Sequence, residues 1–225
     1  MAPHVIVSYD GTENDHDALM LGRLLAEVGA RLTLAYVRHA VQECPDHEEL
    51  AHHEAVARLQ RGAELLDDPY VERRVVISPS TGEGLARLAR ELDADVIAFG
   101  SEYRTPRGRV AVGRPAQTLL ERAPAAIALA PAGYTAPDLA RIGILRGTAD
   151  EAAIETAYSL AARHEATVTD SARGVDLLVV GSRPEARDGQ VMISASATHA
   201  IDEAATPVLV VARGAALRFE TLVTV

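Results

Sequence analysis

Short apolar segments alternate with segments of helical spacing along most of the 225-residue chain, and this alternation limits the fold more than any other feature. The apolar segments are HVIVSY (4–9), RLTLAYV (31–37), VERRVVIS (71–78), DVIAFG (95–100) and AAIALA (125–130). Helical spacing covers residues 13–30, 45–66, 82–92 and 115–123. Strands that are buried on both faces and separated by helices predict a parallel sheet with crossover connections.

The same pattern then begins again, so the chain contains an internal repeat. The segment HVIVSYDGTENDHDALMLGRLLAE resembles RIGILRGTADEAAIETAYSLAAR (141–163) at an offset of 136 residues, which sets Asp10 opposite Arg146. DVIAFGS resembles DLLVVGS (176–182), and APAAIALAPAG resembles AATPVLVVARG, both at an offset of 81. The difference of 55 residues equals one helix–strand–helix block, so the second copy is predicted to lack that block. Loss of an edge strand removes one row of ladder hydrogen bonds, whereas loss of a central strand would split the sheet.

The composition argues against several classes of partner. Acidic residues outnumber basic ones by 32 to 22, and the formal charge of −10 disfavours nucleic acid and anionic membranes. Cys44 is the only cysteine, so neither an intramolecular disulfide nor a cysteine-based zinc site is expected. The first residues lack the pattern of a signal peptide, and no apolar run has the length of a membrane span. We therefore expect a cytoplasmic protein.

One loop carries a local excess of positive charge in this acidic chain. FGSEYRTPRGRVAVGRP (99–115) holds four arginines, three glycines and one acid. Arginine suits phosphate because its guanidinium donates two parallel hydrogen bonds, and glycine lets the backbone approach an anion closely. The loop is therefore a candidate phosphate site. The alternative interpretations are a solvated surface loop and a contact with a protein partner.

These residues resemble the universal stress protein family in its tandem, two-domain form. YDGTENDHDAL is similar to the first strand-to-helix turn of that family, and ERAPAAIALAPAG is similar to its closing helix-to-strand turn. The resemblance implies a doubly wound parallel sheet of strand order 3-2-1-4-5 in two tandem domains, the second lacking the edge strand and two helices. It implies a complete domain over residues 1–133, a linker over 134–140 and a truncated second domain over 141–225. The last strands of the two domains are expected to pair, and the tail 217–225 has strand character.

The resemblance also implies an ATP site at the carboxyl ends of strands 1 and 4, marked by the motif Gly-x2-Gly-x9-Gly-Ser/Thr. Gly100 and Gly113 match this motif, whereas Tyr103 and Arg114 replace its second glycine and its hydroxyl residue. Gly181 alone matches in the second copy, which is predicted not to bind nucleotide. The candidate nucleotide-binding residues are Asp10, Val37, Gly100, Arg107, Arg109, Gly113 and Arg114.

Two of these residues have alternative roles. Asp10 matches the acid that lies beside adenine and ribose in ATP-binding members, but it equally suits a helix cap or a turn. Val37 matches an apolar position that packs on adenine, but it is also an ordinary residue at a strand end. The family resemblance therefore adds a binding role to positions that the local structure already explains.

The function that follows is that of a non-enzymatic stress-response or regulatory protein with weakened binding of ATP, or of another anionic nucleotide, in the first domain. A homo-oligomer or a protein partner is also expected. The first alternative is an interaction or dimerisation module that binds no nucleotide. The second is a nucleotide hydrolase, for which Asp10 is the only plausible general base. No metal site is expected, because HEELAHHE (47–54) departs from the HExxH pattern of zinc hydrolases.

Overall fold

The computed structural model describes residues 2–39, 45–145 and 150–219. The first half of the chain has the order β1 (His4–Ser8), α1 (Glu13–Glu27), β2 (Arg31–Arg38), α2 (Pro45–Leu65), β3 (Glu72–Ile77), α3 (Thr81–Leu92), β4 (Val96–Phe99), α4 (Arg114–Arg122) and β5 (Ala126–Leu129). The second half has the order β6 (Arg141–Ile144), α5 (Glu151–His164), β7 (Thr167–Thr169), β8 (Leu177–Val180), α6 (Ala195–Glu203) and β9 (Val208–Val210).

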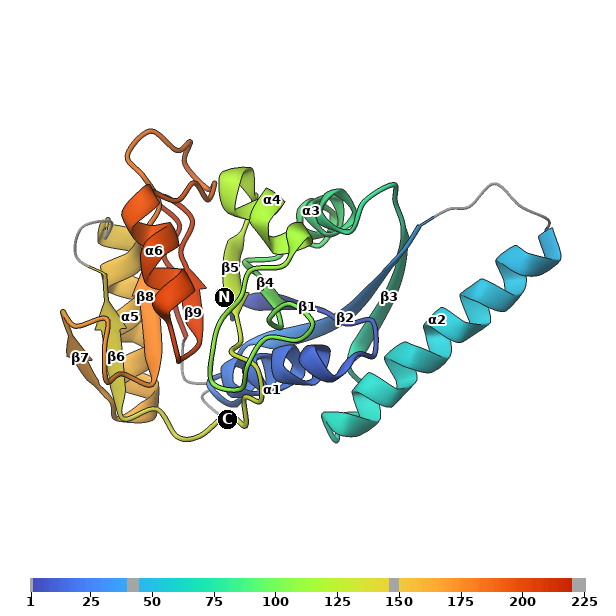
Figure 1. Cartoon of the computed structure of the whole chain (residues 1–225), viewed down its shortest axis with the longest axis horizontal. Helices are drawn as coiled ribbons and strands as arrows, with labels where there is room; N and C mark the ends of the chain where they lie inside the picture. Colours follow the sequence, from blue (N-terminus) through green and yellow to red (C-terminus); the bar gives the residue numbers. More distant parts are fainter. Residues whose placement is uncertain (1, 40–44, 146–149, 220–225) are drawn as a thin grey trace.

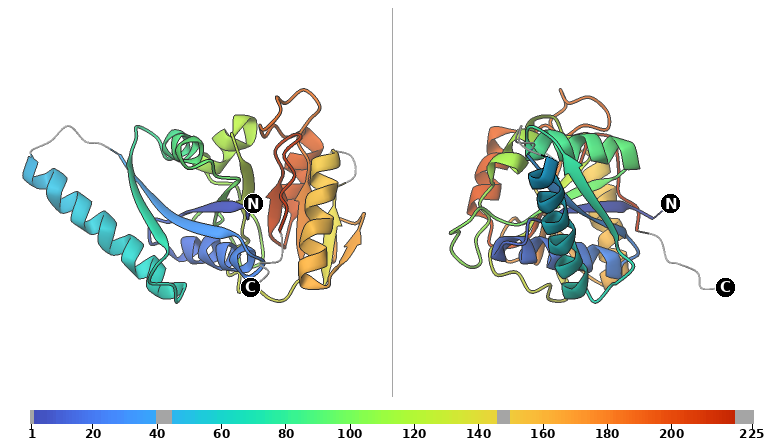
Figure 2. Two further views of the ribbon diagram at one scale, coloured as in Figure 1. Left: turned by 180° about the vertical axis from the view of Figure 1, so that it is seen from behind. Right: turned by 90° about the vertical axis from the view of Figure 1, so that its right-hand side faces the viewer.

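The described residues form one nine-stranded sheet in the order β3-β2-β1-β4-β5-β9-β8-β6-β7. All neighbouring strands are parallel except β5 and β9, which run antiparallel with Ala128 opposite Leu209. The predicted order 3-2-1-4-5 of the first half is confirmed, and the last strands of the two halves pair as expected. Figure 1 shows the two halves side by side, with β5 and β9 at the centre, and Figure 2 shows the same arrangement from behind.

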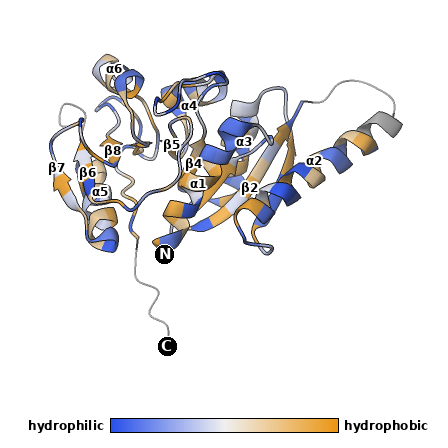
Figure 3. Cartoon of the chain, turned by 60° about the horizontal axis from the view of Figure 1, so that its bottom comes forward, coloured by the Kyte–Doolittle hydropathy of each residue, from blue (hydrophilic) through white to orange (hydrophobic). Residues whose placement is uncertain are grey.

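Helices cover both faces of this sheet, so the strand residues divide between two cores. Val5 and Val7 of β1 point to the face that α1, α2 and α5 cover, whereas Ile6 between them points to the face of α3, α4 and α6. This alternation of direction along a strand explains why the strands read as continuous apolar runs. In Figure 3 polar residues alternate with apolar ones along α2 and α3, as expected for helices with one face in a core.

Within residues 141–145 and 150–219, the second half has no counterparts of α2, β3 and α3, as the repeat predicted. The strands β7 and β8 are consecutive in the chain and pair with opposite edges of β6. The short segment that connects them must therefore cross β6 without a helix. Gly143 of β6 makes room for this crossing, because a Cβ on that residue would lie 2.3 Å from the carbonyl oxygen of Ser171. A direct loop has therefore replaced a whole helix–strand–helix block.

The register of the repeat differs by one residue from the sequence prediction. The amide of His4 donates to Asp95, and the amide of Arg141 donates to Asp176 in the same way. His4 and Arg141 are therefore equivalent, and the strand offset is 137 rather than 136 (4 to 141). The error arose because apolar runs without internal polar marks align almost equally well after a one-residue slip. Arg146, which the sequence set opposite Asp10, lies outside the described residues.

The prediction of strand character for the tail is wrong for the part that the structure describes. Residues 217–219 form no ladder. Instead, the amide of Leu217 donates to the Thr156 hydroxyl at 2.9 Å, and the amide of Phe219 donates to the Ser159 hydroxyl at 2.8 Å. The tail therefore runs along α5 with its apolar side chains buried, because side-chain hydroxyls rather than a strand edge satisfy its amides.

Candidate functional site

A cavity of about 340 Å³ lies at the carboxyl ends of β1, β2 and β4. In an open parallel sheet, ligands bind where the strand order reverses, and here this point lies between β1 and β4. The lining residues come from the ends of β1, β2 and β4 and the loops after them, from the first turns of α1, α3 and α4, and from one position on α2. Among them are four predicted site residues, namely Asp10, Val37, Gly100 and Gly113.

The loop after β4 is held tightly against the beginning of α1. The side-chain amide of Asn14 donates to the carbonyl oxygens of Ser101 at 2.8 Å and Glu102 at 2.6 Å. Gly100 approaches the same turn so closely that a Cβ would lie 1.8 Å from the Asn14 carbonyl oxygen. The glycine at position 100 is therefore required by close packing of two backbones at the floor of the cavity.

Gly113 has a different role at the opposite wall. It is the N-cap of α4, and Pro115 follows in the first turn, where the fixed φ of proline suits a helix. A Cβ at this position would meet only Pro115 Cδ, at 3.8 Å. The space in front of Gly113 is thus open to a ligand rather than filled by the protein.

Asp10 forms a turn and also contributes to a pair of carboxyl groups. Its Oδ1 accepts a hydrogen bond from the Thr12 amide at 2.9 Å, and its own amide donates to the carboxylate of Asp15. Burial, together with the hydrogen bond and the charge of Asp10, raises the pKa of Asp15 to about 8. Burial would also raise the pKa of Asp10, but hydrogen bonds from Asp15 and Thr12 hold it below its usual value. Asp15 therefore carries the proton of this pair near neutral pH.

Val37 and Arg58 form the wall on the side of β2 and α2. Val37 is buried at the strand end, where Gly84 of α3 leaves room for it. Arg58 lies over the ring of Tyr36, 5.3 Å from its centre, and donates to the Tyr36 hydroxyl at 3.0 Å. Sequence reasoning missed Arg58, because one arginine on the polar side of α2 carries no motif.

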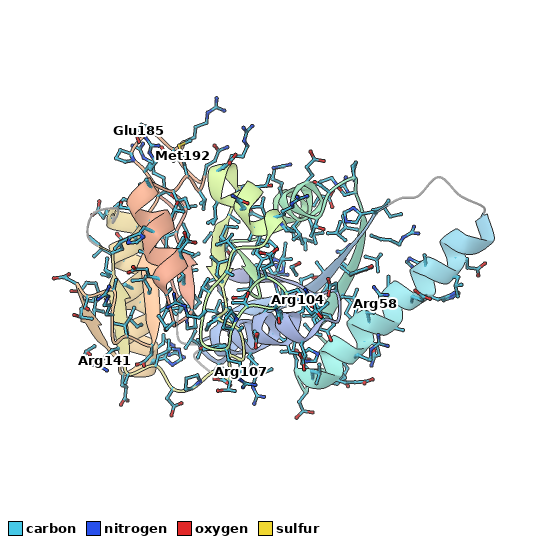
Figure 4. All side chains as sticks on the ribbon, in the orientation of Figure 1. Arg58, Arg104, Arg107, Arg141, Glu185 and Met192 are labelled. Carbon is cyan, nitrogen blue, oxygen red and sulfur yellow. The ribbon has the colours of Figure 1, made fainter. Side chains whose placement is uncertain are left out.

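The arginine-rich loop does not converge on the cavity. Arg107 packs against Gly133, whose Cβ would lie 2.9 Å from the guanidinium, and Arg109 donates to the Glu203 carbonyl at 3.4 Å. Arg114 is exposed on α4 and does not line the cavity, and Arg104 covers the ring of Tyr103. In Figure 4 Arg107 lies at the bottom of the molecule, apart from Arg58.

The path of the loop explains this separation. After Tyr103 the chain leaves the cavity and pairs with the segment that follows β5: the Gly108 amide donates to Ala132, and the Ala132 amide donates to Arg109. The Arg107 guanidinium thus lies beside Gly133, and that of Arg109 contacts the second half at Glu203. The lining includes three acids, Asp10, Asp15 and Glu102, of which Asp15 is protonated near neutral pH, and one arginine, Arg58.

Over residues 2–39, 45–145 and 150–219, three or more His, Cys, Asp or Glu side chains do not gather in any place that could hold a metal ion. None of the helices in the same ranges is both long and apolar enough to cross a membrane.

The fold and the position of the cavity define a doubly wound α/β protein with a candidate ligand site at its switch point. The model of the universal stress protein family matches residues 1–131, and the chain belongs to that family. No curated protein matches the sequence.

Solved structures agree on the fold of the whole chain. A universal stress protein from Archaeoglobus fulgidus aligns with a TM-score of 0.71 and 11% identity, covering 94% of this chain and 98% of that one. A putative universal stress protein from Pseudomonas aeruginosa aligns with a TM-score of 0.67 and 15% identity, covering 93% of both chains. At these identities the likeness establishes the tandem α/β fold.

Proposed function

We propose that the first half of this universal stress protein binds an adenine nucleoside or nucleotide without enzymatic turnover. The observation that carries the proposal is the cavity at the switch point, where Asp10, Val37, Gly100 and Gly113 come together although up to 103 residues separate them (10 to 113). The base would lie against Val37, with Asp10 near the ribose, as the family resemblance implies. We also propose that the first domain ends at residue 133, that the linker ends at residue 140, and that the protein is cytoplasmic.

The phosphate groups would be held weakly. The cavity wall carries Arg58 against the carboxylates of Asp10 and Glu102, with Asp15 protonated, and Arg107, Arg109 and Arg114 do not line it. An unpaired polyphosphate beside carboxylates is disfavoured by like-charge repulsion. We therefore expect adenosine and AMP to bind at least as tightly as ATP.

The first experiment is calorimetric titration of the full chain with adenosine, AMP and ATP, with and without magnesium. A matched pair of variants tests the cavity: Gly113→Leu fills the open space, whereas Gly113→Ala adds one methyl group that the structure accommodates. We expect binding near one ligand per chain, lost in the first variant and kept in the second. Arg107→Ala with Arg109→Ala should leave the affinity unchanged, since both side chains lie outside the cavity.

Other outcomes favour the alternatives. The absence of heat at millimolar concentrations of all three ligands would favour an interaction module that binds no nucleotide. Steady release of phosphate from ATP, lost in Asp10→Asn, would favour a hydrolase and contradict the proposal.

A further inference from the structure

A larger cavity, of about 870 Å³, lies between α4 and α6, where the two halves meet. It is separate from the cavity at the switch point and shares none of its lining residues. Figures 1 and 3 both show α4 and α6 as neighbours across the junction of the halves. Its volume is in the range of pockets that bind small organic molecules.

Reciprocal hydrogen bonds frame this cavity. The Val110 amide of the first half donates to the Ala204 carbonyl of the second half at 3.1 Å. The Val191 amide of the second half donates to the Ala123 carbonyl of the first half at 3.0 Å. Each donor and each acceptor is 81 residues from its equivalent (110 to 191, 123 to 204). The cavity therefore lies on the pseudo-twofold axis that relates the halves.

Ten of the thirteen lining residues form five equivalent pairs, and the two members of most pairs have similar chemistry. The two arginines are exceptions, because their equivalents, Glu203 for Arg122 and Glu102 for Arg183, are acids outside the lining. The pairs at the offset of 81 are Ala111 and Met192, Val112 and Ile193, Gln117 and Thr198, Leu120 and Ile201, and Glu121 and Asp202. The motif positions of the switch-point site differ between the copies, with Tyr103 opposite Pro184 and Arg114 opposite Ala195. The apolar and acidic residues of this cavity are thus matched on both sides, whereas the motif positions and the two arginines are not.

Packing explains the matched apolar pairs but not the matched acids. Leu120 and Ile201 are buried in the core, so their apolar character is required there. Glu121 and Asp202 are exposed on α4 and α6, and neither forms an ion pair within residues 2–39, 45–145 and 150–219. Neither the packing of the core nor an ion pair therefore explains why each wall carries an acid.

The charges of the cavity favour a cation. Two arginines also line it, but Arg183 is paired with Glu185 at 3.1 Å. Arg122 thus offsets one of the two carboxylates, and one negative charge remains. The partly exposed side chains of Val112, Met192 and Ile193 provide an apolar surface between the walls.

We propose that this cavity binds a small organic dication, a linear hydrocarbon chain with an amine at each end. The chain would lie on Val112 and Ile193 across the pseudo-twofold axis, and the ammonium groups would face Glu121 and Asp202. A ligand with two equal ends suits a cavity with two equivalent walls, because both ends then find the same kind of partner.

The test is calorimetric titration of the full chain with three probes: 1,8-diaminooctane, 1,4-diaminobutane and octanoate. We expect 1,8-diaminooctane to bind at one per chain and at least tenfold more tightly than the other two, since one lacks the apolar length and the other the amines. The double variant Glu121→Gln with Asp202→Asn should lower its affinity at least tenfold. These substitutions are isosteric and lie on the surface, so the variant should melt at the same temperature as the parent.

Two controls make the result specific to this cavity. Gly113→Leu, in the switch-point cavity, should leave the affinity for 1,8-diaminooctane unchanged. Ile193→Gln should weaken it, because the apolar contact is lost. The proposal is overturned if octanoate binds more tightly than the diamine, if the double variant binds as well as the parent, or if 1,8-diaminooctane gives no heat at millimolar concentration.

Discussion

Ser101 and Ser182 hold the same position in the two halves of the chain, and their hydroxyls make the same hydrogen bond. Ser101 Oγ donates to the Ala130 carbonyl at 2.7 Å, and Ser182 Oγ donates to the Val211 carbonyl at 2.7 Å. The first bond connects the loop after β4 to the end of β5, and the second connects the loop after β8 to the end of β9. Both serines are buried, and these hydrogen bonds make them structural links.

Removal of the Ser182 hydroxyl should destabilise the second half. The hydroxyl also accepts a hydrogen bond from the Met192 amide at 3.3 Å, so Ser182→Ala leaves two backbone groups without a partner. A buried polar group without a partner costs about 1–3 kcal/mol. We expect a loss of stability in that range, measured by urea unfolding, and a similar loss for Ser101→Ala. An unchanged midpoint in both variants would contradict the structural role.

Gly143→Ala tests the loop that replaces the missing block. The added methyl group would lie 2.3 Å from the Ser171 carbonyl oxygen, so either β6 or the crossing loop must move. Overpacking of this kind costs about 1–3 kcal/mol. Thermal unfolding should show the loss. Gly174→Ala, in the same loop, is a poor control because its φ of +67° is unfavourable for alanine. Thr169→Ser, at the end of β7, is a better one and should have little effect.

The carboxyl pair of Asp10 and Asp15 should make stability depend on pH. The pKa of Asp15 is about 8 in the folded protein, but a carboxyl group in the unfolded chain loses its proton near pH 4. The folded state therefore holds more protons between these values, and stability falls as the pH rises through them. Asp15→Asn should remove this fall and should raise the melting temperature at pH 8 relative to the parent protein.

The most informative range for this measurement lies above pH 6.5. Burial lowers the pKa of His4 and of His164, so below that value both histidines make stability rise with pH and oppose the effect of Asp15. Above pH 6.5 their contribution fades, because most histidine in the unfolded chain has by then lost its proton as well. A parent protein whose melting temperature is flat between pH 6.5 and 8 would show that Asp15 is already ionised there.

Asp17 should control the attachment of the linker. Its buried carboxylate accepts hydrogen bonds from the Gly133 amide at 2.9 Å and the Tyr134 amide at 2.8 Å. Asp17→Ala removes both, whereas Asp17→Asn keeps an acceptor for one. Limited proteolysis should therefore cut within residues 134–140 faster in the alanine variant than in the parent, with the asparagine variant in between. Equal rates in all three proteins would mean that other contacts hold the linker.

The fold class and the truncated repeat could be predicted from the sequence alone. Strand and helix periodicity are local properties, and the backbone hydrogen bonds of a buried apolar run require neighbouring strands. The alternation therefore predicted the parallel sheet, and the two offsets predicted which block the second half lacks. The one-residue error in register came from strands such as HVIVS and RIGIL, in which apolar residues point to both faces and leave no local mark.

The residues that line the candidate site could be identified only from the tertiary structure. Asp10, Val37, Gly100 and Gly113 lie at strand ends and helix starts, which the sheet order brings together. The loop arginines were misplaced because their positions depend on backbone contacts with the segment after β5 and with the second half, which no local pattern encodes. Long-range contacts likewise place Arg58 at the switch-point cavity and set α4 opposite α6 at the second cavity. Side chains distant in sequence become neighbours in this way only once the whole sheet has formed.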